Sequence, residues 1–500
     1  MERPDVAPQV RGVPTEAIAL ATSETKPMYT ELVPIDLPTV VKVALAENVD
    51  IRQAREIVEA QRGQYESAVG AAFPVLVPTA FFERFDGGFR NTDGRIFQVG
   101  STVFQPSVGI EWITNPGRVV YGIIAARKRL SASEHDEDAV KLETLRRAAS
   151  EFYELVLAQA QVATAEEGVA EARELLRVNR LRVKAGTGVP ADELRAEALL
   201  AARQQDLVAA LNRFYEASIA LTVTLHLDSS ATLVPKMENL SAEELVRADL
   251  QIEKLLANAV AWRPDLQSVR TLAEVLSAEE QATLWSGFGP EFILAYRYGG
   301  ITGHANNVVP AEGVPGNLIV NPLSPTGAFS ANPVANGLIR EGILRGSQKL
   351  DSRGDRTFTF RDQQYVAAGA GLELSLSTFG ELKTADARYK HIMLEAVRRL
   401  DVVRSQVVRA AQASKTQREL IALAQQQVAS AEEALRLTQA NLEAGTMTTL
   451  DVLQAQDAAT QARLRSAEAV VRYNQSQVDL LAAIGLLDAA TLLGTGSESE

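Results

Sequence analysis

Apolar residues recur at seven-residue intervals through two long stretches of the chain. The heptad positions are Leu155, Val162, Val169, Leu176 and Val183 in the first stretch, and Ile421, Val428, Leu435 and Leu442 in the second. Alanines lie three residues after several of them, at Ala158, Ala165, Ala172, Ala424 and Ala431. A sustained heptad repeat predicts a coiled coil, and the alanines allow two helices to approach closely. We therefore expect long paired helices.

The helix that carries the first heptad repeat is long. Residues 118–185 contain no proline, and their only glycines are Gly122 and Gly168. At a rise of about 1.5 Å per residue, such a helix extends for about 100 Å. Each heptad stretch ends at a glycine, after which helical spacing soon resumes. The pattern predicts two antiparallel helical hairpins, 118–227 with its tip at 186–191 and 381–486 with its tip at 445–450.

Runs of alternating apolar and polar residues precede each long helix. In the first half they span about 75–85 and 97–113 and predict a β-hairpin. In the second half they span about 291–298 and 357–377. The Gly-, Asn- and Pro-rich segment 299–355 has no counterpart in the first half and is predicted to be a long loop.

The two halves of the chain are related in sequence. Gly186-Thr187 and Asp192 match Gly445-Thr446 and Asp451 at a shift of about 259 residues, without a gap from Val169/Val428 to Leu227/Leu486. Each half is predicted to be helix (39–69 in the first), β-hairpin, very long helix, tip turn and returning helix. The expected fold is mainly α with a small β part. The expected segments are an extended arm 1–38, a first repeat 39–228, a connector 229–249, a second repeat 250–487 and a disordered tail 488–500.

Four short strands leave open sheet edges, which favour aggregation and are not tolerated inside a bilayer. Closure by several chains removes the edges, and three chains would supply twelve strands, within the range of outer-membrane barrels. Several aromatic residues of the strands suit lipid-facing or interfacial positions. They are Phe81, Phe82, Trp112, Phe292, Tyr296 and Tyr298.

Composition excludes several classes of function. The net charge of -13 argues against nucleic acid, which needs basic patches. The chain has no cysteine, so disulfides, thiolate metal sites and a thiol nucleophile are excluded. The four histidines are not at metal-ligand spacing, and the five methionines are scattered. No phosphate loop, nucleophile elbow or zinc-protease motif is present, so we expect neither a cofactor nor an enzyme.

Targeting signals are not evident in the sequence. There is no apolar run of about 18 residues that would form a transmembrane helix. The start, Met1 to Pro4, does not resemble a secretory signal, and we expect a longer upstream reading frame to supply one. An alternative function follows from the missing signal: a soluble coiled-coil scaffold whose strands form a local interaction sheet. The matched hairpins in both halves oppose that alternative.

The chain resembles the TolC-like outer-membrane efflux protein family, the outer membrane factors, over about residues 39–487. The motifs that carry the resemblance are Gly445-Thr446 with Asp451-Val452-Leu453 and Ala455, the weaker copy Gly186-Thr187 with Asp192, Leu194 and Ala196, and Arg263-Pro264-Asp265-Leu266. The duplicated order of elements strengthens the match beyond any single motif.

The resemblance implies a homotrimer with a 12-stranded barrel in the outer membrane and a helical tunnel in the periplasm. It implies partners as well: a periplasmic adaptor, an inner-membrane transporter and outer-membrane lipid. Substrate would leave passively through this duct. The tip would be closed by rings of aspartates at Asp192 and Asp451, and Gln454 stands where some family members have a second aspartate.

Simpler structural roles are also open for the tip residues. Asp192 and Asp451 favour a helix start for electrostatic reasons alone, and Pro190 suits the first turn of a helix. Gly186 and Gly445 suit helix-ending turns, with Thr187 and Thr446 beside them. The resemblance places adaptor contacts at these same turns. The two roles are compatible, since a residue that starts a helix can also carry charge near a pore axis.

Overall fold

The computed structural model describes residues 31–90, 96–228, 231–236, 240–247, 251–306, 357–372, 376–444 and 446–492. The expectations for the arm before residue 31, for most of the loop 299–355, for Gly445 and for the end of the tail lie outside the described residues. The first residues of the expected loop, 299–306, continue a strand instead.

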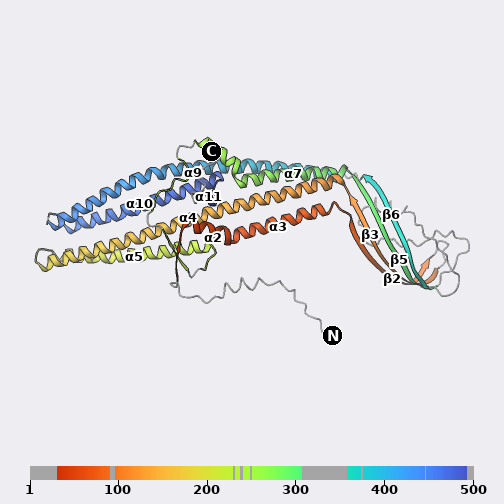
Figure 1. The fold of residues 1–500 in the computed structure, drawn as a ribbon, viewed down its shortest axis with the longest axis horizontal. Helices are drawn as coiled ribbons and strands as arrows, with labels where there is room; N and C mark the ends of the chain where they lie inside the picture. The colour runs from red at the N-terminus through yellow and green to blue at the C-terminus, as the bar shows by residue number, and fades with distance from the viewer. Residues whose placement is uncertain are drawn as a thin grey trace, which may run out of the picture. The chain divides into compact units, whose positions relative to one another are not determined.

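The order of elements repeats along the chain (Figure 1). The first half holds β1 (Glu31–Ile35), α2 (Leu37–Glu47), α3 (Val49–Gly70), β2 (Val75–Arg90), β3 (Ile96–Thr114), α4 (Pro116–Lys184), α5 (Pro190–Thr224) and β4 (Ala231–Pro235). The second half holds α6 (Ile252–Trp262), α7 (Pro264–Phe288), β5 (Pro290–Asn306), β6 (Thr357–Leu372), α9 (Ser377–Glu443), α10 (Thr449–Ile484) and α11 (Ala489–Leu492). The predicted mainly α fold, with its hairpins and very long helices, is confirmed.

The chain folds as two compact units, and each takes segments from both sequence repeats. Unit 1 comprises Met1–Ile57, Glu134–Ser268 and Ala396–Glu500, and unit 2 comprises Val58–Ser133 and Val269–Glu395. The long helices α4 and α9 contribute to both units. A repeat in the sequence is therefore not a compact body in the structure.

Unit 2 contains a four-stranded antiparallel sheet in the order β2-β3-β5-β6. Two strands run further than their sequence patterns indicate, since β2 reaches Arg90 and β5 reaches Asn306. The strand expected over 357–377 is shorter, because β6 ends at Leu372 and α9 begins at Ser377. The two hairpins that the sequence predicts are joined through β3 and β5, where Ile110 faces Tyr296.

Unit 1 contains a second sheet that the sequence analysis did not predict. β1 and β4 pair in parallel, with Val33 opposite Leu233, and the buried Ser218 hydroxyl of α5 accepts a hydrogen bond from the Leu233 amide at 2.8 Å. Five-residue parallel strands from distant segments leave no local signal, because a parallel pair needs a long crossover connection. The described chain thus has six strands rather than the four expected.

The heptad residues lie on the packed side of the long helices. Leu155, Val169, Leu176, Leu435 and Leu442 are buried. Around Leu155, the large buried side chains Phe152 and Tyr153 join residues of α2, α5, α9 and α10 in one core. The heptad pattern therefore identified the faces that hold unit 1 together.

One expected helix is broken. The apolar spacing predicts a single helix over 39–69, but α2 ends before Asn48 and α3 begins at Val49. The Asn48 side-chain oxygen accepts hydrogen bonds from the amides of Asp50 and Ile51, which caps α3, and its amide donates to the Thr224 carbonyl at 3.0 Å. The helical apolar spacing continues through the break, so periodicity alone did not show it.

Candidate functional site

The first tip turn is a helix-ending motif built around Gly186. Its φ is +75°, a left-handed conformation that glycine adopts without steric cost. The Gly186 amide donates to the Val183 carbonyl at 3.1 Å, and the Thr187 amide donates to the Arg182 carbonyl at 3.0 Å. This pair of bonds is a Schellman motif, which satisfies carbonyls left over at the end of α4. The Thr187 hydroxyl also donates to the Arg182 carbonyl, at 3.3 Å.

The second tip turn repeats these contacts. The amide of Thr446 donates to the Asn441 carbonyl at 2.9 Å, and the Thr446 hydroxyl donates to the same oxygen at 3.0 Å. Thr446 and Asn441 are the repeat counterparts of Thr187 and Arg182. Gly445 itself lies outside the described residues. The two threonines therefore make equivalent hydrogen bonds at the ends of their helices.

Asp451 completes a capping box at the start of α10. The Thr448 hydroxyl accepts from the Asp451 amide at 3.3 Å, while the Asp451 carboxylate accepts from the Thr448 amide at 2.9 Å and from its hydroxyl at 2.6 Å. These hydrogen bonds from Thr448 lower the pKa of the Asp451 carboxyl. Because the pKa of Asp451 is lower in the folded state, its charged carboxylate stabilises the folded state at pH values above the unfolded pKa. This stabilisation is lost as the pH falls through the folded pKa.

Asp192 occupies the matching third position of α5 but has different partners. The cap residue there is Val189, which has no side-chain hydrogen bond to offer, and α5 begins at Pro190 as predicted. The Asp192 carboxylate instead accepts from Arg195 at 3.1 Å, and Asp192 is half-buried. Two equivalent aspartates thus carry unequal local charge, since one is paired with a cation and the other with neutral groups.

The unequal caps yield a prediction from a matched pair of substitutions. Val189→Thr should add the missing cap to α5, and Thr448→Val should remove the one on α10, each changing helix-start stability by about 1 kcal/mol in opposite directions. Amide hydrogen exchange in the first turn should slow in the first variant and speed up in the second. Unchanged exchange after Thr448→Val would show that the capping box does not hold this end.

Beyond the turns, the helices of the two hairpins pack together. Leu176 of α4, Ala196 of α5, Leu442 of α9 and Val452 of α10 belong to one buried cluster. Asn179 and Thr449 add a buried hydrogen bond of 3.1 Å between α4 and α10. Gln454 lies one turn after Asp451 and is exposed. The tips therefore form one packed body, with Gln454 on its surface.

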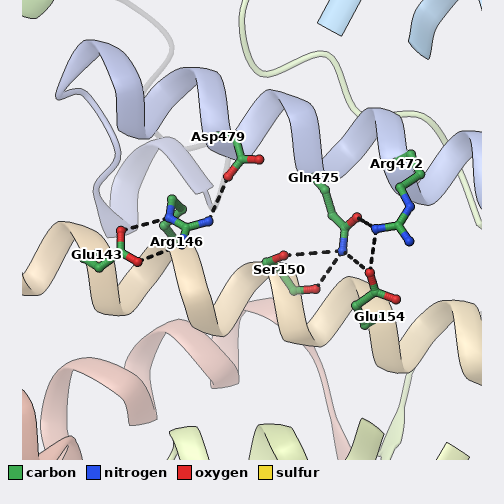
Figure 2. Close-up of polar contacts among 7 residues, drawn as sticks. All are labelled: Glu143, Arg146, Ser150, Glu154, Arg472, Gln475 and Asp479. Carbon is green, nitrogen blue, oxygen red and sulfur yellow. Dashed lines mark hydrogen bonds and ion pairs between the residues drawn. The ribbon is translucent and has the colours of Figure 1, made fainter. Parts of the chain in front are cut away.

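A seam of polar contacts continues along α4 and α10 (Figure 2). Gln475 donates to the Ser150 carbonyl at 3.1 Å and to Glu154 at 3.0 Å, and Arg472 donates to Glu154 at 2.8 Å. About one helical turn before Ser150 on α4, the Arg146 guanidinium donates a hydrogen bond to the Asp479 carboxylate at 3.1 Å. The seam joins the two repeats, because α4 belongs to the first and α10 to the second.

Sequence reasoning missed this seam. Asn474, Gln475, Ser476 and Gln477 are consecutive and all buried. A run of four uncharged polar residues within an amphipathic helix was the available signal, because buried polar groups require partners. Asn474 and Gln477 find theirs in the connector, where Asn474 bonds the Glu243 amide and the Ser241 carbonyl, and Gln477 accepts from the Val246 amide.

The Arg263-Pro264-Asp265-Leu266 motif lies at the boundary between α6 and α7 in unit 1. The Arg263 guanidinium binds Asp265 through two hydrogen bonds of 2.9 and 2.8 Å, and it donates to Gln406 at 2.7 Å and to the Ala483 carbonyl at 3.3 Å. Ala483 is the repeat counterpart of Thr224, which Asn48 contacts in the first half. In both repeats, a side chain at the boundary between two consecutive helices thus binds a backbone carbonyl at the end of the returning helix. Asn48 does so in the first repeat and Arg263 in the second.

The returning helices also end alike. Gly485 follows α10 with φ +77°, and its counterpart His226 follows α5 with φ +52°. Within the described chain His226 is the only residue other than glycine with a positive φ. A Cβ on Gly485 would lie 2.8 Å from the Arg263 backbone nitrogen, so this glycine is needed for space as well as for conformation.

The sheet of unit 2 has two unlike faces. The register places Phe82, Trp112, Phe292, Tyr296 and Tyr298 on one face. The opposite face carries the Glu111–Arg297 ion pair at 2.7 Å and the Thr79–Ser107 hydrogen bond at 2.6 Å.

Phe81 belongs to the polar face. It lies one position from Phe82 and faces Gln105, so its side chain points away from Trp112 and the tyrosines with which the sequence analysis grouped it. The Trp112 indole donates to the Ala72 carbonyl at 3.0 Å, at the end of the sheet where α3 ends. A lipid-facing role therefore stays a prediction for the other five residues, whereas Phe81 lies on the opposite face from them.

The described residues contain no group of three or more His, Asp or Glu side chains placed to hold a metal ion. None of the helices in that part of the chain combines the length and apolar character needed to cross a membrane.

A model of the family described as "Outer membrane efflux protein" matches residues 40–225 and 344–486, which together make up more than half of the chain. The chain belongs to the outer membrane efflux protein family. The two matched segments fall one in each repeat, so the family pattern covers both helical hairpins. A comparison with curated protein sequences found no match.

Solved structures of outer membrane channels share the fold of this outer membrane efflux protein. The outer membrane protein VceC of Vibrio cholerae is 16% identical, with 90% of this chain and 96% of that chain covered and a TM-score of 0.68. The CmeC outer membrane channel of Campylobacter jejuni is 16% identical, with 92% and 88% covered and a TM-score of 0.68. The open state of the MtrE outer membrane channel of Neisseria gonorrhoeae is 19% identical, with 91% and 90% covered and a TM-score of 0.64.

Proposed function

We propose that this chain is the outer-membrane exit duct of a tripartite efflux or type I secretion system. In this proposal three copies form a homotrimer whose strands close a 12-stranded barrel in the outer membrane, and the long helices extend into the periplasm. A periplasmic adaptor docks at the tip turns, and an inner-membrane transporter drives substrate through the passive duct.

The observation that carries the proposal is the family match across both repeats, together with a fold shared over most of the chain with outer membrane channels. The two-faced sheet supports it further. One face presents aromatic and aliphatic side chains suited to lipid, and the other presents an ion pair and hydroxyls suited to water.

Fractionation and conductance test the proposal. The native protein should extract from the outer membrane with detergent as a trimer, and the trimer should produce discrete conductance steps in a planar bilayer. Recovery from the cytosol without detergent would reject the duct and favour a coiled-coil scaffold.

The tip aspartates are proposed to make the closed duct prefer cations. Asp451→Asn keeps a side-chain acceptor for Thr448 and removes the charge. The cation preference should fall several-fold, because the ring of three Asp451 side chains in the trimer loses all three of its charges. Asp192→Asn should have the smaller effect, since Arg195 already offsets that charge. Reversal potentials in a salt gradient measure both.

Asp206→Asn on the exposed side of α5 is the matched control, with no expected change in ion preference. An unchanged preference after Asp451→Asn would remove this residue from the gate. Gln454→Asp should raise the preference if its exposed position faces the pore.

A further inference from the structure

A charged pair and a tyrosine lie side by side on the polar face of the unit 2 sheet. Glu111 belongs to β3 and Arg297 to β5, and the two side chains form an ion pair at 2.7 Å. Tyr365 of β6 is the partner of Arg297 on the next strand. The three strands are neighbours in the sheet (Figure 1). Cross-strand partners on one face lie about 5 Å apart at Cβ, so Tyr365 stands beside the stem of Arg297.

Solvent reaches this pair only slightly. Arg297 is 13% exposed and Glu111 is 16% exposed, and Tyr365 beside them is 8% exposed. Glu83, a carboxylate further along the same face, is exposed. Opposite charges attract more strongly where water is excluded than at a wet surface. The charge of Arg297 is therefore balanced within the sheet, whereas the charge of Glu83 meets water.

A glycine gives the arginine room to lie along the sheet. Gly109 of β3 is the partner of Arg297 on β5. A Cβ on residue 109 would lie 3.4 Å from both Cβ and Cγ of Arg297 and 3.1 Å from the Tyr296 carbonyl oxygen. Glu111 lies two positions beyond Gly109, which is about 7 Å along the strand. The Arg297 side chain therefore has to run along the sheet to reach Glu111, and a larger residue at 109 would crowd it.

We propose that Glu111 and Gly109 hold Arg297 flat against the inner wall of the barrel, with its charge cancelled, so that the barrel does not retain anionic substrates. Three uncompensated arginines in a trimer would form a cationic ring in the exit path, and such a ring binds anions. Glu111 is then a specificity-determining residue of the duct. The inference rests on the proposed function, in which the polar face of the sheet lines the lumen.

Block by a multivalent anion tests the inference. Glu111→Gln keeps the size of the side chain and an acceptor for Arg297, and it removes the balancing charge. Hexacyanoferrate(II), added on the barrel side of trimers in a planar bilayer, should reduce the current of this variant several-fold and leave the wild-type current unchanged. Adding Arg297→Gln to Glu111→Gln should abolish the block, because no cationic ring remains.

Glu83→Gln is the matched control, since it removes an exposed carboxylate from the same face. Its current should be as insensitive to hexacyanoferrate(II) as that of the wild type. An equal block in Glu83→Gln and Glu111→Gln would show that only the number of carboxylates on this face matters, which overturns the inference. A Glu111→Gln trimer that conducts without block overturns it as well and leaves the duct standing.

Exchange of the two charges provides a second variant if Glu111→Gln fails to assemble. Glu111→Arg combined with Arg297→Glu keeps one ion pair in each chain, so it should assemble as a trimer and conduct without block. A block in the exchanged variant overturns the inference. Loss of the trimer in both variants assigns the pair to barrel assembly instead, which also overturns it. Wild-type trimers that do not conduct at all overturn the proposed function itself.

Discussion

Replacing Gly485 by alanine is expected to destabilise unit 1 by about 2–5 kcal/mol. A side chain in the left-handed region costs about 1–2 kcal/mol. The new Cβ would also lie 2.8 Å from the backbone nitrogen of Arg263 and 2.9 Å from the backbone carbon of Trp262. These are backbone atoms and cannot rotate away, so overpacking adds about 1–3 kcal/mol. The midpoint of thermal unfolding, followed by helical circular dichroism, should fall clearly.

Gly186→Ala is the matched control. Gly186 has nearly the same φ, +75°, but a Cβ there meets nothing within 4 Å. Its substitution should cost only the conformational part, about 1–2 kcal/mol. Equal losses in the two variants would contradict the claim that the close approach to Arg263 matters.

Replacing Arg263 by methionine is expected to cost about 3 kcal/mol. The change keeps much of the side-chain volume but leaves Asp265 without its two-bonded partner, in a site where the two side chains are only 14% and 20% exposed. Removing one member of a largely buried pair strands the other charge. The Ala483 carbonyl and Gln406 lose a donor at the same time. Arg399, 4.0 Å from Asp265, offsets part of the loss.

Arg404→Met provides the comparison for this substitution. Arg404 pairs with Asp401 on the same helix, with both side chains more than half exposed, and its loss should cost at most about 0.5 kcal/mol. Chemical denaturation under identical detergent conditions measures both. Similar losses would show that Arg263 contributes no more than a surface ion pair.

Patterns that are local in sequence predicted their structures well. The heptads of α4 and α9 marked buried faces, and the glycines and threonines marked the tip turns, because both signals depend on residues within one or two helical turns. The alternation in the strands predicted both hairpins. It did not separate Phe81 from Phe82, which requires the register.

Features that depend on distant partners were not predictable in the same way. β1 is stabilised by pairing with β4, about 200 positions later in the chain, and the break at Asn48 is held by the Thr224 carbonyl. The tip aspartates were identified by their position. Their unequal partners, Thr448 and Arg195, could be assigned only from the geometry of each cap.

The polar seam also constrains how the chain reaches its final state. Arg146 and Asp479 are 333 positions apart, and Ser150 and Gln475 are 325 apart. The face of α4 that carries Arg146 and Ser150 therefore meets these partners only after α10 has been synthesised. Contacts of such separation slow folding, because a long loop must close before they can form. A copy that stops before α10 leaves Ser150 and Glu154 without the side chain of Gln475. This stretch of α4 is therefore expected to be more sensitive to proteases in an unfinished chain than in a finished one.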